Sequence, residues 1–559
     1  MEALAETTTQ STRPVETSVA KGRRIMIFTA GTRGDVQPFA ALGSALEQAG
    51  FVVCVATNAN HVKFIRQFGL EAVSTGPDLE KIFADNPAIR TCLESGDIQK
   101  MLKEFEPILI RDFPQDFADK IRAVDTWKPD VILATPVEGP EVAAIAGARG
   151  IPSILTSLQV ILPSRDQPTM LGEPRCFPRR ILGTVLQYLL WRNQRDTKNA
   201  VILEQLPAAT PFVAASLRQH MLNVFHPIVP MMVGFSPSLY SLKTDWTADV
   251  KSRIKFTGFW VVSRDEQVAH MGRQDANFGG EDSAGLVAFL AQGPPPVYMG
   301  WGSMVAVSGR HMACLAVRSL MKANLRGIIL GGWAKLELSS LEGQQDTEEM
   351  LGYARENLLF VQSAPHEWLF PQCSAIVHHG GAGTTAAALR SGVPSVVTPF
   401  SFDQFDNAQL ISNHGVGVAM RQFAKVTVAD LAAALTRCTT NANLIATAHL
   451  LGEKLRSEDG LRNAVKVVDD FIVQEVDSGK WRLRSDRRAK QMRLLQARQS
   501  PGCLAWVGRL CCSWAPNDYS VKLPEDHADK RGNFSERNVG GAPTLLTRIL
   551  SGDAAKSKC

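Results

Sequence analysis

The sequence predicts an α/β protein built from two successive doubly wound parallel sheets. Short apolar runs alternate with stretches of helical spacing. This alternation stops in a polar segment near the middle of the chain and then restarts, and each half has a glycine-rich segment directly after an apolar run. Such runs are typical of parallel strands buried on both faces. The 559 residues exceed what one core organises, so we expect more than one domain.

The first half begins with an apolar run at 24–30, which predicts a buried strand. A glycine-rich segment follows at 31–38, helical spacing at 39–49, and a second apolar run at 51–57. Strand, glycine-rich loop, helix and strand form the βαβ unit of a doubly wound sheet. Further elements are predicted as strands at 131–134 and 153–156, a helix at 141–149, and a mostly helical region at 162–223.

The second half follows a polar segment rich in glycine and aspartate, which is typical of a linker. Its strands are predicted at 297–301, 327–330, 358–361, 375–378 and 395–398, and a helix at 461–476 closes it. The predicted organisation is therefore a disordered lead (1–21), an N-terminal Rossmann-like domain (22–262), an interdomain linker (263–290), a C-terminal Rossmann-like domain (291–479) and a basic, largely disordered tail (480–559).

Charge is unevenly distributed along the chain. The formal net charge is only +5, but residues 480–559 carry 16 Lys and Arg against 7 Asp and Glu. The basic stretch 480–498 has a single aromatic residue, Trp481, and no aromatic residues interleaved among its other charges, so no nucleic-acid partner is expected. Two interpretations of the tail stay open: a solvated extension, or loose attachment to an anionic membrane. As a helix, Trp481, Met492 and Leu495 would not form one clean apolar stripe.

Targeting signals are not visible in the sequence. Residues 1–20 lack the apolar stretch of a secretory signal, and no apolar run approaches the ~20 residues of a membrane span. We therefore expect a cytoplasmic protein, with peripheral membrane contact through the tail as an alternative. No Cys pair has CxxC spacing, so no structural zinc site is expected.

The segment from His378 to Thr385 carries the strongest chemical signal. It places two histidines, three glycines and two threonines between a predicted strand and a predicted helix. Glycines let a ligand approach the backbone, and the amides of a helix N-terminus point toward negative charge. Imidazole and hydroxyl groups add further hydrogen-bond donors. The segment therefore predicts a phosphate site rather than a plain turn.

Together with its neighbours, this segment resembles the nucleotide-sugar signature of family 1 glycosyltransferases. The resemblance rests on the segments 364–371, 378–385, 389–394 and 399–404, on Gly31 to Pro38 in the first half, and on Tyr298 to Ser303 in the second. It covers residues 22–475 and is closest to the branch of sterol 3-β-glucosyltransferases and antibiotic glycosyltransferases. The family implies a GT-B fold, two Rossmann-like domains facing across a cleft, with inversion at the anomeric carbon and no metal ion.

The resemblance also implies roles for individual residues. The implied donor-binding residues are Ser303 near the phosphates, Ala364 and Pro365 beside the uracil, His379, Gly381, Ala382, Gly383 and Thr384 at the diphosphate, and Asp403 and Gln404 at the sugar hydroxyls. Asp35 matches the catalytic base. Its competing interpretation is a helix-capping residue, because Asp is common at helix starts. No cofactor is implied, since the UDP-sugar is a co-substrate.

Several residues keep two interpretations. Arg33 could orient Asp35 or be solvated. Glu138 and Glu141 follow the strand at 131–134, where an acid could assist the base. Trp301 and Trp333 could contact the donor or lie in the core, and isolated histidines such as His61 are expected to be structural.

The predicted function is transfer of a hexose, with glucose from UDP-glucose as first candidate, to a hydroxyl of a lipophilic acceptor. Sterol-specific relatives carry a Pro-Trp-Thr-Arg-like stretch where this chain has Thr156 to Pro163. A sterol is therefore one candidate beside terpenoids and other secondary metabolites. The alternative is a non-catalytic sugar- or lipid-binding protein, since a fold alone does not fix function.

Overall fold

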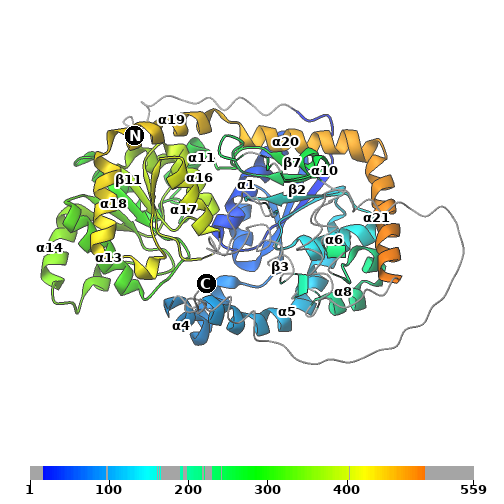
Figure 1. Ribbon diagram of the computed structural model, residues 1–559, viewed down its shortest axis with the longest axis horizontal. Helices are drawn as coiled ribbons and strands as arrows, with labels where there is room; N and C mark the ends of the chain where they lie inside the picture. Colours follow the sequence, from blue (N-terminus) through cyan, green and yellow to red (C-terminus); the bar gives the residue numbers. More distant parts are fainter. Residues whose placement is uncertain are drawn as a thin grey trace, which may run out of the picture. The chain divides into compact units, whose positions relative to one another are not determined.

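The computed structural model describes residues 17–95, 98–159, 198–216, 230–240, 245–401 and 403–497, with scattered positions between 162 and 243. Two parallel sheets, one from each half of the chain, organise this part of the protein (Figure 1). The first has the order β3-β2-β1-β4-β5-β6-β7 and the second the order β10-β9-β8-β11-β12-β13. The predicted α/β class with two doubly wound sheets is thus confirmed.

The strands of the first sheet are β1 (Arg24–Phe28), β2 (Val52–Asn58), β3 (Glu71–Gly76), β4 (Val131–Ala134), β5 (Ser153–Ser157), β6 (Met231–Val233) and β7 (Ile254–Phe256). The helices that accompany them are α1 (Arg33–Gln48), α2 (Val62–Arg66), α3 (Leu79–Asp85), α4 (Pro87–Ser95), α5 (Ile98–Trp127), α6 (Gly139–Arg149), α8 (Asn199–Gln205) and α10 (Ala248–Arg253). Of the region predicted as mostly helical, most positions from 160 to 229 lie outside the described residues.

The strands of the second sheet are β8 (Val297–Gly300), β9 (Gly327–Leu330), β10 (Leu358–Val361), β11 (Ala375–His378), β12 (Ser395–Val397) and β13 (Gly417–Ala419). The helices around them are α13 (Gly309–Ala323), α14 (Thr347–Asn357), α15 (His366–Leu369), α16 (Ala382–Ser391), α17 (Gln404–Asn413), α18 (Val428–Thr440) and α19 (Ala442–Ser457). Between the two sheets the chain forms α11 (Arg264–Gly272) and α12 (Ser283–Ala291), which fall in and near the predicted linker.

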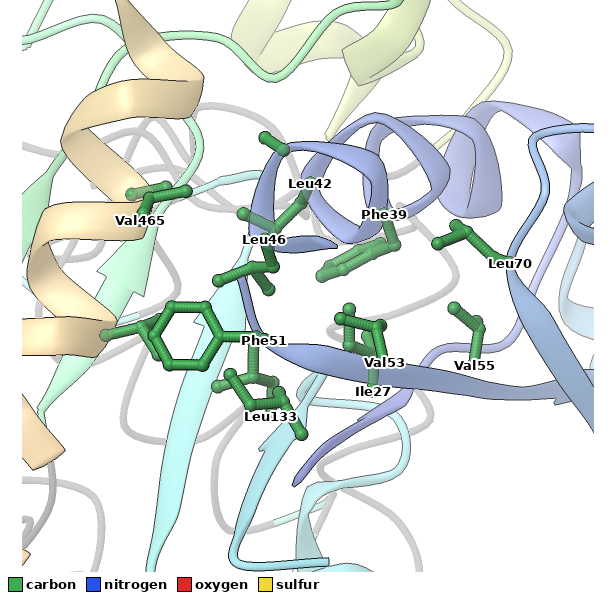
Figure 2. Close-up of a cluster of buried hydrophobic side chains, with 14 of the residues drawn as sticks. Ile27, Phe39, Leu42, Leu46, Phe51, Val53, Val55, Leu70, Leu133 and Val465 are labelled. Atoms are coloured by element: carbon green, nitrogen blue, oxygen red, sulfur yellow. The ribbon is translucent and has the colours of Figure 1, made fainter. Parts of the chain in front are cut away.

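Both faces of the first sheet are buried, which explains its continuous apolar strands. Ile25 and Ile27 point into one core layer, whereas Met26 and Phe28 point into the opposite one. Figure 2 shows the first layer, where Phe39, Leu42 and Leu46 of α1 pack over the strands. Successive side chains of a strand alternate between faces, so a parallel sheet covered by helices on both sides needs apolar residues throughout.

After the second sheet the chain returns to the first one. Helix α20 (Gly460–Phe471) contributes Val465, Val468 and Phe471 to the core layer below α1, and Figure 2 shows Val465 beside Leu42 and Leu46. The predicted closing helix therefore packs against the N-terminal half. The crossing is tight, because a Cβ atom on Gly460 would lie 2.2 Å from the Phe259 carbonyl oxygen. Asn463 also donates its side-chain amide to the Thr257 carbonyl over 2.9 Å.

Residues 480–497, predicted as the start of a largely disordered tail, instead form a packed helix, α21 (Lys480–Ala497). Trp481, Ser485, Ala489 and Met492 are buried along one side, at the spacing of one helix face. The expectation that no clean stripe exists is wrong, because the small residues Ser485 and Ala489 complete it. Residues 498–559 lie outside the described part of the chain.

Candidate active site

In each sheet the strand order reverses beside the first strand of that half. In the first sheet β1 lies between β2 and β4, and in the second β8 lies between β9 and β11. Crevices at such switch points, outside the carboxyl ends of the strands, are the usual ligand sites of doubly wound sheets. Gly31 to Asp35 follow β1, Ser303 follows β8 and His379 follows β11. The main predicted site segments therefore emerge at the two switch points.

Helix α1 begins at Arg33, earlier than predicted, so Asp35 lies in its first turn. The backbone N–H of Thr32 donates to Asp35 Oδ2 over 2.7 Å, and the Thr32 hydroxyl donates to the same oxygen over 3.0 Å. This is the reciprocal arrangement of a capping box. Asp35 therefore does cap the helix, but from the third helical position, because the N-cap itself is Thr32. Its Oδ1 accepts no hydrogen bond from the described residues.

The turn before α1 is held from both sides. Gly31 has φ +134°, and a Cβ atom there would lie 2.4 Å from Asp35 Oδ2, so only glycine fits. The Gly31 N–H donates to Asn58 Oδ1 over 2.9 Å, and the Gly31 carbonyl lies 3.1 Å from His61 Nε2. His61, expected to be structural, therefore fixes the backbone next to Asp35. Sequence reasoning missed Asn58, which carries no local signal.

Asp35 combines an exposed side chain with a dense surrounding of protein. The residue is exposed by surface area, yet burial among neighbouring atoms raises its carboxyl pKa above the usual value, while the Thr32 hydrogen bonds and His61 act in the opposite direction. A raised pKa makes the carboxylate a stronger base than an ordinary surface Asp.

The second glycine-rich segment joins β11 to α16. Gly381 is the N-cap, and the first helical hydrogen bond of α16 runs from Thr385 N to the Gly381 carbonyl, 2.9 Å. The N–H groups of Ala382, Gly383 and Thr384 precede that bond, so they form the open N-terminus of the helix. This is the arrangement that binds anions. Helix α16 begins at Ala382, so Gly383 and the two threonines belong to its first turn.

The two histidines of this segment have different environments. His378 is fully buried, and its Nδ1 accepts a hydrogen bond from Gly380 N over 3.2 Å. His379 is partly exposed, and burial lowers its pKa to about 4. Its Nδ1 has no hydrogen-bond partner within the described residues. At neutral pH His379 is therefore an uncharged imidazole, able to donate one hydrogen bond to a ligand.

Loops from both halves meet around this segment. A Cβ atom on Gly302 would lie 3.4 Å from His379 Cε1, which places the Ser303 loop beside His379. A Cβ atom on Gly383 would lie 3.2 Å from the Gly34 carbonyl oxygen. Pro38 has no N–H to donate to that carbonyl, although it occupies the position that would do so in a regular helix. The turn that carries Asp35 therefore faces the N-terminus of α16 directly.

Asp403 and Gln404, predicted as the sugar-binding pair, have different surroundings. The Gln404 side chain is buried, and its Oε1 accepts from the N–H groups of Phe400 and Ser401 over 2.8 Å and 3.2 Å. Asp403 Oδ2 accepts a 2.6 Å hydrogen bond from Gln159 Nε2 of the N-terminal half. Burial, together with the negative charge of Asp35, raises the Asp403 pKa to about 7. Of this pair, only Asp403 is partly exposed.

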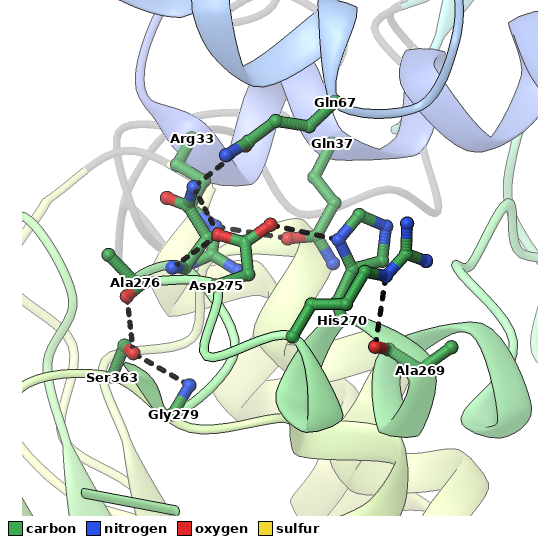
Figure 3. Close-up of polar contacts among 11 residues, drawn as sticks. Arg33, Gln37, Gln67, Ala269, His270, Asp275, Ala276, Gly279 and Ser363 are labelled. Carbon is green, nitrogen blue, oxygen red and sulfur yellow. Dashed lines mark hydrogen bonds and ion pairs between the residues drawn. The ribbon is translucent and has the colours of Figure 1, made fainter. Parts of the chain in front are cut away.

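Ala364 and Pro365 follow β10 and are buried beside the segment that joins the two halves. A Cβ atom on Gly279 would lie 3.8 Å from Pro365 Cδ. Ser363 donates to the Ala276 carbonyl over 2.6 Å and accepts from Gly279 N over 2.9 Å (Figure 3). These hydrogen bonds hold the Ala364–Pro365 turn against the segment between the sheets.

The contacts of Trp301 and Arg33 bear on two of the open alternatives. Trp301 is a core residue, 2% exposed, and its indole donates to the Thr398 hydroxyl over 2.8 Å. Arg33 is not solvated: burial lowers its pKa to about 10, and its guanidinium lies over the rings of Phe64 and Phe278, 5.5 Å and 5.0 Å from their centroids. Figure 3 shows it beside Gln37, whose Oε1 accepts from Arg33 Nε over 3.1 Å.

The acids that follow β4 are engaged with lysines. Lys120 of α5 lies 2.7 Å from Glu138 and 2.5 Å from Glu141, and Lys198 also pairs with Glu141. Although burial acts in the opposite direction, the two lysines lower the pKa of the Glu141 carboxyl below its usual value. Glu138 and Glu141 are therefore structural ion-pair partners in this arrangement.

Two family models match the chain. The model of the glycosyltransferase family 28 N-terminal domain matches residues 25–132, and that of the C-terminal domain of erythromycin biosynthesis protein CIII-like proteins matches residues 341–469. Together they span the turn that carries Asp35 and the segments that carry His379 and Asp403.

Curated relatives include several sterol 3-β-glucosyltransferases. One from Arabidopsis thaliana is 27% identical over 519 residues, covering 90% of this chain and 77% of that protein. One from Debaryomyces hansenii is 27% identical over 79% of this chain, and one from Emericella nidulans is 28% identical over 80%. This chain spans only 26% and 30% of the length of those two fungal proteins.

Solved structures share the fold. The kitacinnamycin glycotransferase aligns with a TM-score of 0.53 at 19% identity, covering 80% of this chain and 98% of that one. The calicheamicin glycosyltransferase CalG4 aligns with a TM-score of 0.53 at 14% identity, covering 81% and 98%. With the family models, the curated relatives and the two switch-point loops, these likenesses identify the chain as a family 1 glycosyltransferase with the GT-B fold.

Proposed function

We propose that this protein transfers a hexose, with inversion, from a UDP-sugar to a hydroxyl group of a lipophilic acceptor, and that UDP-glucose is its donor. The observation that carries the proposal is the direct approach of the Asp35 turn to the N-terminus of α16, where Gly383 faces the Gly34 carbonyl. This approach supports a proton acceptor from one half next to an anion site from the other. Direct displacement at a sugar carbon requires this placement.

In the proposed reaction Asp35 removes the proton from the acceptor hydroxyl as its oxygen attacks the anomeric carbon. The bond between that carbon and the diphosphate oxygen breaks, and UDP leaves with the electron pair. The amides of Ala382, Gly383 and Thr384 and the neutral His379 imidazole stabilise the charge that develops on the diphosphate. We propose that no metal ion or further cofactor takes part.

Aromatic side chains near the Ser303 loop support the proposal that the acceptor is lipophilic. The Phe83 ring of α3 lies 5.5 Å from the Phe105 ring of α5 and 5.5 Å from the Trp333 ring. The backbone N–H of Trp333 donates to the Gly302 carbonyl over 3.0 Å, which places this aromatic cluster next to the Ser303 loop. All three rings are partly exposed. Such rings offer a flat apolar surface to a fused-ring molecule.

Sterols are one candidate class, since the curated relatives are sterol 3-β-glucosyltransferases. Terpenoids and other hydroxylated secondary metabolites are the others, because the stretch from Thr156 to Pro163 differs from that of sterol-specific relatives. The deciding experiment incubates the purified protein with UDP-glucose and a panel of sterols and terpenoids. We expect UDP release and a hexose mass increment on one acceptor class. Binding of UDP-glucose without any transfer would instead support a non-catalytic sugar-binding protein.

A further inference from the structure

Gln159 links the N-terminal half to the sugar-binding carboxylate and has no assigned role. It follows β5, and its backbone N–H donates to the Ser157 hydroxyl over 3.2 Å, which fixes the start of the loop. Its side-chain Nε2 donates to Asp403 Oδ2 over 2.6 Å across 244 residues of sequence. β5 lies next to β4, which lies next to β1, so Gln159 belongs to the same sheet edge as Asp35.

The contacts of Asp403 and Gln404 leave the sugar site short of polar groups from the C-terminal half. Gln404 Oε1 already accepts from two backbone N–H groups, and its Nε2 lies 3.5 Å from Met304 Sδ. Asp403 is partly exposed, and the Gln159 amide is the only side-chain donor that the described residues place on it. A carboxylate accepts hydrogen bonds but donates none, so Asp403 alone cannot satisfy the acceptor lone pairs of a sugar hydroxyl.

The Gln159 amide supplies the missing functions. Its NH₂ group donates and its carbonyl accepts, which matches a hydroxyl that does both. In the present arrangement the NH₂ group satisfies the carboxylate that a sugar hydroxyl would otherwise meet. We propose that Gln159 completes the sugar subsite from the N-terminal half, so that its amide and the Asp403 carboxylate bind neighbouring hydroxyls of the transferred hexose. This inference rests on the proposed function.

The proposal predicts different effects on the binding of the hexose and of the UDP moiety. The UDP moiety is bound by residues of the second half, whereas the hexose requires both halves. Removing the Gln159 amide should therefore weaken binding of a UDP-sugar and leave binding of UDP unchanged. A hydrogen bond to a charged or strongly polar partner contributes about 1.5–3 kcal/mol, which corresponds to a loss of roughly ten- to a hundredfold.

The test is calorimetry of UDP and UDP-glucose with the wild type, Gln159→Leu, and the control Gln292→Leu, which changes an exposed glutamine after α12. We expect the ratio of the two dissociation constants, UDP-glucose over UDP, to rise roughly tenfold in Gln159→Leu and to stay at the wild-type value in the control. Gln159→Glu keeps the size of the side chain and places a second carboxylate beside Asp403. It should raise the same ratio as well.

The outcomes are distinguishable. If the wild type binds UDP-glucose and neither Gln159 variant changes the ratio, the inference is overturned while the proposed function stands. Equal weakening of UDP and UDP-glucose would also overturn it, because Gln159 would then act only on the closure of the two halves. If the wild type binds neither UDP-glucose nor any other UDP-hexose, the proposed function itself fails.

Discussion

At the scale of single residues, we propose that Asp35 combines a structural and a chemical role. Its Oδ2 closes the capping box with Thr32, whereas Oδ1 accepts no hydrogen bond from the described residues and is the oxygen we propose as proton acceptor. Asp35→Asn keeps the shape and one hydrogen-bond acceptor but removes the basicity. We expect turnover to fall by ~10²–10⁴, the range typical of general bases, while the dissociation constant of UDP stays unchanged. Turnover within threefold of the wild type would move the role of base to another residue.

The pH profile tests the same assignment. Only the carboxylate form accepts a proton, so the rate is full above the Asp35 pKa and is lost as the pH falls through it. Because burial raises this pKa, the decline of kcat/KM should begin at a higher pH than for a solvated Asp. Burial also raises the Asp403 pKa to about 7, so protonation of Asp403 would add a change in sugar binding to the same profile. The KM for the donor should therefore be measured at each pH. A flat profile down to pH 4 would contradict a raised pKa at the base.

His379 tests the diphosphate site. His379→Ala removes a neutral imidazole that lies beside the Gly302–Ser303 loop. We expect UDP affinity to fall roughly tenfold, the effect of losing one hydrogen bond to a charged group. His449→Ala, on the exposed surface of α19, is the matched control and should bind UDP like the wild type. Unchanged UDP affinity in His379→Ala would remove His379 from the donor site.

At the scale of elements, the N-terminus of α16 depends on the absence of a side chain at Gly383. Gly383→Ala would place a Cβ atom 3.2 Å from the Gly34 carbonyl oxygen and push the Asp35 turn away. Alanine favours a helix over glycine, so we expect the Tm to stay the same or rise while kcat falls at least tenfold. Gly352→Ala in α14, where nothing lies within 4 Å of the new atom, should leave kcat unchanged.

Helix α21 rules out simple truncation of the chain as a test of membrane attachment. Truncation after Gly479 would remove the buried Trp481 and Met492, so it would destabilise the N-terminal half. The face opposite that buried stripe carries Leu483, Arg487, Lys490 and Leu494, and the two leucines are 62% and 42% exposed. This combination supports the proposal of loose contact with an anionic membrane. Among the described residues, none of the helices combines the length and hydropathy that a membrane span requires.

The sharper experiment replaces two charges and keeps the helix. Arg487→Glu with Lys490→Glu should reduce co-sedimentation with phosphatidylserine vesicles at least tenfold at low salt, since each basic residue contributes about 1 kcal/mol at such a surface. The Tm should stay within two degrees or so, because both side chains are exposed. Equal sedimentation of wild type and variant would show that this face is not the attachment site.

Strands and helices were predictable to different degrees. β4, β9, β10 and β11 have the predicted bounds, because a strand buried on both faces is a continuous apolar run in the sequence. β3, β6, β7 and β13 were missed, since the first is half exposed and each of the other three has only three residues. The early start of α1 was missed because Gly34 and Pro38 are both helix-breaking residue types. In the structure both lie in the first two turns of this helix.

At the scale of the whole molecule, the candidate site was predictable only where a motif carried it. His379, Gly383 and Asp403 lie in segments with strong local composition. Gln159, Asn58 and the inward turn of Gln404 depend on contacts between segments far apart in sequence, for which a single glutamine or asparagine gives no signal.

The metal-free mechanism is a prediction for the molecule as a whole. Within the part of the chain that the structure describes, no group of three or more His, Cys, Asp and Glu side chains is arranged to hold a metal ion. We expect transferase activity to survive dialysis against EDTA and to show no gain from added Mg²⁺. Loss of activity on chelation that Mg²⁺ or Mn²⁺ restores would contradict the proposed role of the α16 amides in neutralising the leaving diphosphate.

The close packing of Gly460 against Phe259 has a mechanical consequence. The chain leaves the first sheet after β7 and comes back to it at the start of α20, so two covalent connections cross between the halves at one point. Because these two connections lie side by side, they are arranged as a hinge. Rotation about the line through them strains neither connection, whereas twisting or sliding one half along the other strains both. A rotation of this kind would move Asp403 away from Gln159 along one defined arc, and its reversal would restore the same hydrogen bond.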